Sequence, residues 1–435
     1  MATNRLLSQS AAFLHPRENN LFLPLFRLHT RQRSQLRRPL STSRDAVRRG
    51  GNLKLAIKKI APPTNCIPSP EHLKRRTRSG VEFDRDLYER YASAGHVPVM
   101  FCEVLEAFRI PRLRSFVDCT LGAAGHSSAI IEAHRELELF VGLDVDTLAV
   151  DKARTRIEAL VSDGCREELK VYTHARNFKY IKAVLDGVDE NPLSEGVDGI
   201  FMDLGISSMQ VDNLERGFSV LGDGPLDMRM DPQQPLSKAT LKAEDILNSW
   251  PEAEVGRILR DYGEESNWWF LQEKIINARK KGGLHSTREL VDLVRKASGK
   301  SGGRLGWIKT ATRVFQALRI VVNDELQTLE NALYACFDCL SSGGRLAVIS
   351  FHSLEDRIVK KAFLDIIENE GEDDEEDYTV KRNDKIGTGT QIWSKQKIVG
   401  RNGTILTKRP ITPSEDEERL NRRCRSAKLR VIQKH

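Results

Sequence analysis

One short stretch, residues 116–126, limits what this chain can fold into more than any other part of it. It reads Phe-Val-Asp-Cys-Thr-Leu-Gly-Ala-Ala-Gly-His. The apolar, β-branched start predicts a buried strand that ends at Asp118, and a helical pattern begins at Ser127 after a loop of small residues. A strand, a tight loop and a helix form the opening unit of a doubly wound α/β sheet, whose ligands lie at the strand ends. The stretch therefore predicts such a sheet and a binding site beside the loop.

The same loop indicates the class of ligand. Gly122 and Gly125 allow the backbone to approach a ligand closely, but Ala124 stands where the dinucleotide pattern G-x-G-x-x-G has its second glycine. A pyrophosphate needs a cradle of bare amides at a helix N-terminus, so this loop favours a ligand without phosphates and disfavours a nicotinamide dehydrogenase. A second predicted strand, 139–143, ends at Asp144, which is spaced from the loop like the acids that bind ribose hydroxyls. A nucleoside without phosphates indicates S-adenosylmethionine.

The positive charge of the chain is concentrated at its start. The net charge is +7, yet residues 1–80 hold 17 Lys and Arg against three acids, which leaves 51 basic and 58 acidic residues in the rest. A leader that is rich in Arg and Ser and poor in acids is typical of an organellar transit peptide. The Met-Ala start followed by hydroxyl residues favours a chloroplast, and the arginines of 31–49 keep a mitochondrion open. A disordered, RNA-binding arm is the alternative.

The pattern of apolar residues divides the body of the chain into an α/β domain and an insert. Strand patterns occur in 81–207 and in 312–435, whereas 208–311 shows helical periodicity alone. We therefore expect an α/β domain in two parts, interrupted by a helical insert that recognises the substrate. No apolar run approaches the ~18–20 residues of a membrane span, so no membrane partner is expected. The helices predicted in the insert are 243–250, 253–262, 270–280 and 287–297.

The second part of the α/β domain begins with a long predicted helix, 312–340, whose apolar residues recur at spacings of three and four. Cys336 and Cys339 lie on this helix, where core packing explains them better than zinc or redox chemistry. The elements predicted after it are a strand at 345–351, a helix at 358–367, an acidic, mobile loop at about 365–405 and a last strand at 428–432.

Polar side chains follow each predicted strand of the sheet. Any one of them has a structural alternative; Asp144, for example, is placed to cap a helix at 147–160. Because the carboxyl ends of parallel strands meet at one edge, we expect the whole set to form one site. The set comprises Asp118, Asp144, Asn177 with Phe178 after a strand at 170–173, Asp203 after a strand at 197–203, and His352.

The segment Asp203-Leu-Gly-Ile-Ser-Ser indicates the reaction at this site. An exocyclic amine of cytosine or adenine is a poor nucleophile, because its lone pair is delocalised into the ring. An oxygen acceptor must bind its hydrogens and align the nitrogen with the methyl group. Asp203, with Ser207 and Ser208 beside it, is the candidate catalytic group. Such a reaction needs neither a metal nor a covalent intermediate.

Several longer motifs extend this interpretation to a family. The chain resembles the MraW/RsmH-type methyltransferases, which methylate N4 of a cytosine in the decoding region of small-subunit ribosomal RNA. The resemblance implies a class I S-adenosylmethionine-dependent methyltransferase (Rossmann-like) fold with an inserted helical domain. It covers about 96–431 and includes the motifs at 96–99, 118–126, 203–210, 215–219, 223–231, 311–320 and 349–357.

The resemblance also implies roles for single residues. Ala124, Gly125 and His126 would hold the methionine part of S-adenosylmethionine, and Asp144 would bind the ribose. Phe178 and Asp203 would flank the adenine or the acceptor side, and Gln210 would complete the pocket. The run 224–231 would shape the acceptor pocket, and His352 would orient RNA or serve the active site. The candidates for phosphate contacts are Arg313, Arg319, Arg357, Arg425 and Arg430.

The chain departs from the family pattern in the loop, where Ala123 and Ala124 replace residues that are usually glycine. Alanine is tolerated there unless position 124 requires a positive φ. Small-subunit ribosomal RNA, or the assembling small ribosomal subunit, is the expected partner, and the oligomeric state stays open. The alternative function is a non-catalytic small-subunit assembly factor that keeps the methyltransferase fold. The presence of Asp144, Asp203 and Gln210 favours the enzyme.

Overall fold

The computed structural model describes residues 77–92, 97–164, 166, 168–188, 193–231, 241–298, 303–368 and 397–435. Almost all of the predicted leader, and residues 369–396 of the predicted acidic loop, lie outside these ranges. The first described strand, β1 (Thr77–Arg78), already precedes residue 81, where the α/β domain was predicted to start. None of the described helices is long and apolar enough to cross a membrane.

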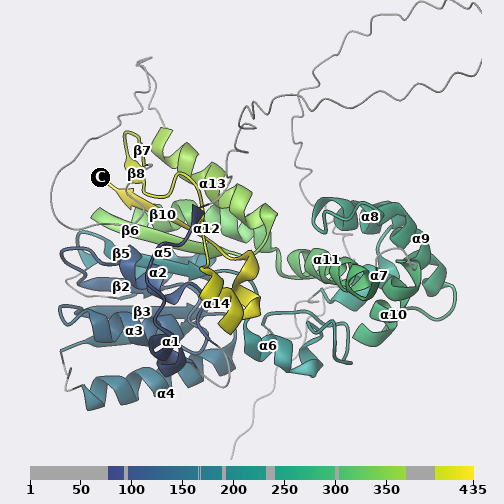
Figure 1. Cartoon of the computed structure of the whole chain (residues 1–435), viewed down its shortest axis with the longest axis horizontal. Coiled ribbons are helices and arrows are strands. Elements are labelled where there is room, and N and C mark those ends of the chain that lie inside the picture. Colours follow the sequence, from purple (N-terminus) through teal and green to yellow (C-terminus); the bar gives the residue numbers. More distant parts are fainter. Residues whose placement is uncertain are drawn as a thin grey trace, which may run out of the picture. The chain divides into compact units, whose positions relative to one another are not determined.

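A single mixed sheet organises the α/β domain (Figure 1). Its main path runs β1-β9-β10-β6-β5-β2-β3-β4, and the strands from β6 to β4 are mutually parallel, as the loop at 116–126 predicts. β10 pairs antiparallel with β6. This is the Rossmann-like fold of class I methyltransferases. The other strands are β2 (Ser115–Asp118), β3 (Leu139–Asp144), β4 (Lys170–Ala175), β5 (Val197–Asp203), β6 (Leu340–Ser350), β7 (Ile398–Val399), β8 (Gly403–Ile405), β9 (Ile411–Thr412) and β10 (Lys428–Lys434).

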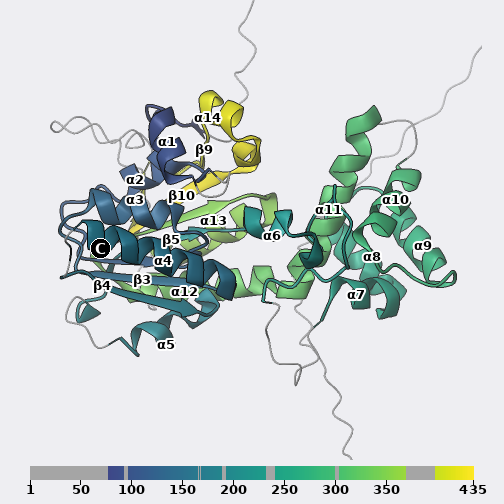
Figure 2. The same cartoon turned by 90° about the horizontal axis from the view of Figure 1, so that it is seen from below.

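Helices cover both faces of this sheet because successive residues of a strand point to opposite faces. On β2, Phe116 belongs to one buried cluster and Val117 to the other. Figures 1 and 2 show helices on either side of the strands. The Phe116 cluster includes residues of α2 (Phe101–Ala107), α3 (Gly125–Ala133) and α4 (Thr147–Asp163); the Val117 cluster includes residues of α5 (Ile181–Leu185), α12 (Glu325–Cys339) and α13 (Ser353–Glu368).

The insert folds around a third cluster of its own, to which Ile246, Leu259 and Leu290 contribute fully buried side chains. The four predicted helices are present with ends shifted by no more than a few residues. Figure 1 shows them grouped with the start of α11. They are α7 (Ala243–Ser249), α8 (Glu252–Asp261), α9 (Trp268–Arg279) and α10 (Thr287–Ala297), and α11 is Gly303–Asn323.

The prediction of one helix over 312–340 is wrong, because two helices occupy this stretch. Asp324 adopts a left-handed conformation with φ 48° and separates α11 from α12. Asn323 fixes the break: its amide donates to Met228 O at 2.8 Å, and its carbonyl accepts from Met230 N at 2.8 Å. The apolar spacing continues through the break because both helices bury one face, so periodicity alone gives no sign of it.

The C-terminal part holds more regular structure than the sequence indicates. α13 runs to Glu368, and β7 and β8 occupy the far end of the predicted acidic loop. α14 (Glu415–Leu420) packs against the start of the domain, where Glu417 Oε1 accepts from Met100 N at 2.6 Å. The remaining helices are α1 (Arg85–Tyr91), α6 (Ser208–Asp212) and the 3-10 turns η1 (Phe178–Tyr180), η3 (Leu214–Arg216) and η4 (Arg422–Ser426).

Candidate active site

A cavity of about 910 Å³ lies at the carboxyl ends of β2 to β5. Its volume is near the upper end of the ~300–1,000 Å³ that is usual for ligand sites, which leaves room for a cofactor and an acceptor nucleoside together. The insert side of the wall includes Met230 and Leu241, and Arg423 of η4 also lines it. The predicted site residues that line it are Asp144, Asn177, Phe178, Asp203, Ser207, Ser208 and Gln210.

Asp144 ends β3 and joins the wall to the glycine loop. Its carboxylate accepts from Gly122 N at 2.8 Å and from Asp146 N at 2.9 Å. The structural alternative for Asp144, that it caps the next helix, does not hold: Asp146 is the N-cap of α4 and accepts from Leu148 N at 3.1 Å. Asp144 is thus left to face the cavity, and burial raises the pKa of its carboxyl above the ordinary value.

The three loop residues expected at the methionine part lie behind the wall. Ala124 is fully buried in the left-handed region with φ 58°, so position 124 does require the positive φ that alanine resists. Gly125 lies close to Pro98, and a Cβ on it would approach that ring to 2.8 Å. His126 Nε2 lies 2.9 Å from Val99 O. The loop residues that line the cavity are instead Cys119, Thr120 and Gly122.

Asp203 is the last residue of β5 and lines the cavity. Its backbone N–H donates to Thr120 Oγ1 at 2.6 Å, which fixes the strand end against the loop. Its Oδ1 is buried and has no hydrogen-bond partner among the described residues. Burial raises the pKa of this carboxyl well above the ordinary value, and the nearby Asp118, Glu355 and Glu417 raise it further. The side chain as a whole is 20% exposed and lines the cavity, and its other oxygen, Oδ2, lies 3.9 Å from His126 Nδ1.

The two serines and the glutamine after Asp203 have structural tasks that the sequence interpretation did not assign to them. Ser207 caps α6: its Oγ accepts from Gln210 N at 3.2 Å, and Gln210 Oε1 accepts from Ser207 N at 3.0 Å. This pattern is a capping box. The Ser208 hydroxyl accepts a hydrogen bond from Arg423, whose guanidinium also donates to Asp212 at 3.2 Å. These bonds hold the wall in place, and the catalytic and cofactor-binding roles stay predictions.

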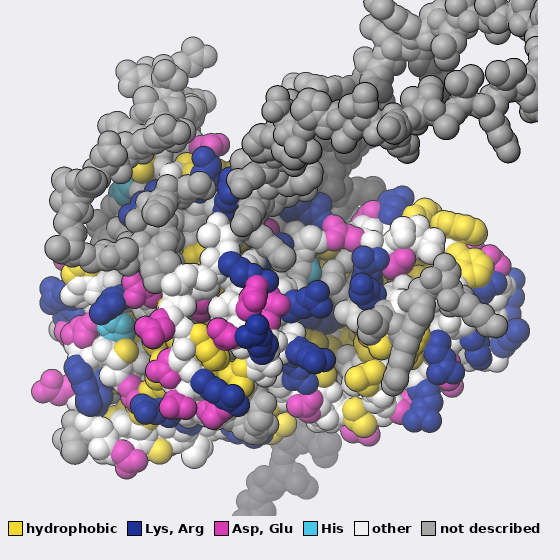
Figure 3. All heavy atoms as spheres, viewed as in Figure 1, with side chains coloured by type: hydrophobic (Ala, Val, Ile, Leu, Met, Phe, Trp, Pro, Cys, Tyr) yellow, Lys and Arg dark blue, Asp and Glu magenta, His cyan; other side chains and the backbone are white. Residues whose placement is uncertain are grey.

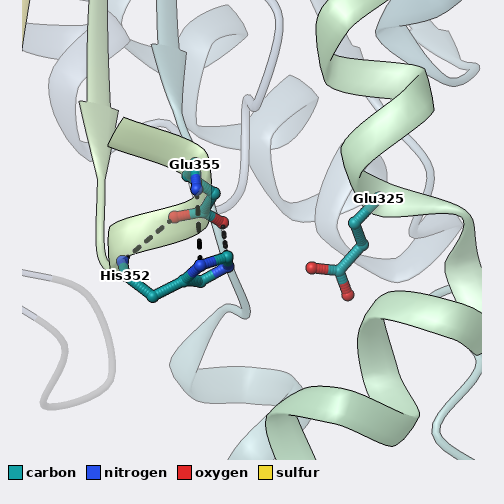
Figure 4. A group of neighbouring side chains, drawn as sticks. All are labelled: Glu325, His352 and Glu355. Carbon is teal, nitrogen blue, oxygen red and sulfur yellow. Dashed lines mark hydrogen bonds and ion pairs between the residues drawn. The ribbon is translucent and has the colours of Figure 1, made fainter. Parts of the chain in front are cut away.

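His352 does not line the cavity itself but belongs to a charge cluster whose carboxylates, Glu325 and Glu355, do. Figure 4 shows it with Glu355 and Glu325. His352 Nδ1 is placed to accept from Glu355 N at 3.4 Å, and Nε2 lies 3.0 Å from Glu355 Oε1. Arg319 donates to both oxygens of Glu325, at 2.8 and 2.9 Å, and lies 4.0 Å from Glu355. The arginine thereby supplies the positive charge that two buried carboxylates need.

Most of the arginines expected to contact phosphate already have partners. Arg313 pairs with Glu265 and Arg430 with Asp356, at 3.3 and 2.8 Å. Arg357 pairs with Glu264. These arginines and Arg319 therefore form ion pairs within the protein. Their acidic partners have no spacing in the sequence that would have predicted these pairs. The basic residues that line the cavity are Arg176, Lys179, Arg229 and Arg423. Of these, Arg229 belongs to the predicted run 224–231, and no site role was predicted for the other three.

The run 224–231 contributes to the cavity as expected. Arg229, Met230 and Asp231 line it. Asp227 receives two 2.7 Å hydrogen bonds from the guanidinium of Arg229, which lowers the pKa of the Asp227 carboxyl. The run therefore forms a braced loop at the insert side of the cavity.

Comparison with known proteins identifies the family. A model of the MraW methylase family matches residues 93–435. This chain belongs to that family. The methylase is 41% identical over 339 residues to a ribosomal RNA small subunit methyltransferase H of Heliobacterium mobile, which covers 78% of this chain and 98% of that protein. The protein with the same name from Brevibacillus brevis is 40% identical over 340 residues, with the same coverage. A solved rRNA methylase from Streptococcus thermophilus covers 76% of this chain and 93% of its own, at a TM-score of 0.31 and 10% identity, too distant a likeness to bear on the site.

The residues of the cavity fit S-adenosylmethionine as the cofactor of this methylase. Asp144 gives the cavity wall a carboxylate, the kind of group that accepts from ribose hydroxyls, and Phe178 gives it an apolar ring. The Gly122 amide is already bonded to Asp144, so it is not available to a pyrophosphate. A nucleoside that ends in an amino acid, without phosphates, matches these groups.

Proposed function

We propose that this methylase transfers a methyl group to N4 of a cytidine in the decoding region of small-subunit ribosomal RNA in an organelle. The observation that carries the proposal is Asp203, a mostly buried carboxylate that lines the cavity at a strand end and has one oxygen without a hydrogen-bond partner among the described residues. The names of the relatives support the substrate class. The family match begins at residue 93 and leaves out the basic leader, which supports import into a chloroplast, with a mitochondrion as the alternative.

The residues of the cavity divide the work of such a reaction. S-adenosylmethionine supplies an electrophilic methyl group. Asp203 accepts a hydrogen bond from the cytosine amine, which turns the nitrogen lone pair toward that methyl, and takes up the proton released after transfer. Asp144 binds the ribose hydroxyls, and the walls exclude water. The base must be unstacked or single-stranded to reach Asp203.

Substitution of Asp203 by Ala or Asn tests this assignment. We expect both variants to lose methyl transfer to small ribosomal subunits, because neither side chain can take up the amine proton, while binding of S-adenosylhomocysteine persists. The readouts are N4-methylcytidine by mass spectrometry of the RNA and cofactor affinity by calorimetry. Retained methylation in either variant would remove Asp203 from the mechanism. An unaltered protein that binds small subunits without taking up cofactor would instead favour the assembly factor.

The pH dependence of the reaction provides a second test. Because the pKa of Asp203 is raised and the ionised form is the one that accepts the proton, the transfer rate should increase as pH rises through that pKa. A single-turnover rate measured across pH checks this. A rate that falls over the same range would contradict it.

The organelle is tested separately. Residues 1–80 fused to a fluorescent protein should accumulate in chloroplasts. Plants that lack the methylase should lose N4-methylcytidine from plastid ribosomal RNA. Loss from mitochondrial ribosomal RNA alone would overturn the chloroplast assignment.

A further inference from the structure

Tyr180 is an exposed aromatic ring on the wall of the cavity, and it belongs to none of the hydrophobic clusters of the described residues. Its surface is 49% exposed. Its neighbour Phe178 also lines the cavity but packs against the buried core. Both residues lie on the turn η1, which Asn177 caps by accepting from Lys179 N at 2.9 Å. A short, capped turn on a strand end is a rigid support for a ring.

The charges around Tyr180 favour an anionic, aromatic ligand. Lys179 Nζ lies 5.2 Å from the centre of the Tyr180 ring, over one of its faces. Lys179 and Arg176 line the same part of the cavity and form no ion pair among the described residues. Most other basic residues nearby are paired, and on the face drawn in Figure 3 the basic and acidic side chains are interspersed. Arg229 and Arg423, the other basic residues of the wall, are ion-paired with Asp227 and Asp212. Arg176 and Lys179 are therefore the two cations of the wall that have no ion pair among the described residues, although the charge of Lys179 partly offsets the rise that burial causes in the pKa of Asp324.

We infer that Tyr180 stacks on the base of a nucleotide adjacent to the target cytidine, with Arg176 and Lys179 holding its phosphates. The inference rests on the proposed function and adds the recognition of the flanking RNA to it. Stacking of one base on an aromatic side chain contributes about 1–3 kcal/mol to the binding of single strands and tolerates any base. Lys179 covers one ring face, so the base takes the other. This contact would hold the strand open beside the base that enters the cavity.

The test uses a short single-stranded RNA with 2-aminopurine next to one cytidine, bound to the full chain in the presence of S-adenosylhomocysteine. Stacking quenches 2-aminopurine fluorescence. We expect quenching with the unaltered protein and with Tyr180→Phe, which keeps the ring. Tyr180→Ala and Tyr180→Leu should lose the quenching and bind the RNA roughly tenfold more weakly. Leucine keeps apolar bulk, so it separates stacking from simple burial.

Two control measurements make the result specific. Trp269→Ala removes a ring that is 59% exposed on α9 and does not line the cavity, and it should change neither the quenching nor the affinity. Replacement of Arg176 or Lys179 by Ala should reduce the dependence of RNA affinity on salt by about one counterion each. The affinity for S-adenosylhomocysteine should be the same in all variants.

Two outcomes would overturn the inference. Unchanged quenching and RNA affinity in Tyr180→Ala would place the stacking contact elsewhere. Weaker binding of S-adenosylhomocysteine with unchanged RNA binding would mean that the ring covers the cofactor. Methylation of small ribosomal subunits by the unaltered protein tests the proposed function separately: its absence would overturn that function, whereas its presence without binding of this RNA would overturn the stacking inference alone.

Discussion

Ala124 keeps the loop conformation of the family, but its left-handed backbone makes the folded protein less stable than a glycine would. The loop needs a left-handed residue at the start of α3, and alanine supplies it with its Cβ in the crowded position. The sequence shows that alanine replaces the usual glycine at position 124, but it does not give the backbone angle there. The angle follows from the hydrogen bond of Ala124 N to Leu121 O at 2.8 Å, which closes the loop.

Ala124→Gly should therefore stabilise the protein by about 1 kcal/mol, because glycine adopts this conformation without the Cβ clash. The measurement is the midpoint of equilibrium unfolding in urea. Ala123→Gly is the matched control: its φ is not positive, so that variant should be neutral or slightly less stable. Equal effects at the two positions would contradict the argument.

The break between α11 and α12 is the feature of the helices that apolar periodicity predicts least well. It places Arg319 of α11 next to Glu325 of α12, and both residues lie beside Glu355 of α13. Burial raises the pKa of Glu325, whereas the nearby His352 and Arg319 hold the pKa of Glu355 below its ordinary value. Three helices thus share one buried arginine, and the insert is joined to the α/β domain at this point.

Arg319→Ala should cost about 3–5 kcal/mol of stability, because it leaves two buried carboxylates without their cation. Lys182→Ala removes a lysine whose ion pair with Asp338 is exposed, so it should cost at most about 1 kcal/mol. Thermal or urea unfolding of the two variants checks the contrast. A small effect for Arg319→Ala would show that the buried carboxylates take up protons instead.

The comparison of elements shows what sequence periodicity can and cannot predict. Strands, helices and the insert follow from apolar spacing, since each element buries one face. The residues of the cavity wall are harder to predict from apolar spacing, because turns bring its cationic residues together from distant segments. Arg423 lies more than 200 positions from Ser208, yet the two side chains are hydrogen-bonded. The cap of α4 could not be chosen from the sequence, because Asp144 and Asp146 are both suitable caps; the structure gives this role to Asp146.

At the scale of the whole molecule, two buried carboxyls lie where the C-terminal helix α14 packs against α2. Glu417 of α14 and Glu103 of α2 are almost fully buried, with Tyr88 beside them. Burial and the charge of Glu103 raise the pKa of Glu417 to about 8. At neutral pH the folded protein thus holds a proton that the unfolded chain releases.

The sign of the pH dependence follows from this difference. The unfolded chain loses the proton near the ordinary pKa of 4.5, so the contribution of Glu417 to stability is complete below that pH and is lost as pH rises toward 8. Glu417→Gln keeps the acceptor for Met100 N and should flatten the decline between these values. Glu415→Gln, at an exposed position of the same helix, should leave it unchanged. Urea unfolding at a series of pH values measures both.

The position of β10 has a consequence for how the protein is made. β10 lies inside the sheet, between β6 and β9, although it follows both in the sequence, so this edge of β6 has no neighbour until β10 has been made. An unpaired edge is a template for aggregation. Chains truncated before β10 should therefore aggregate or depend on chaperones rather than accumulate as partly active protein.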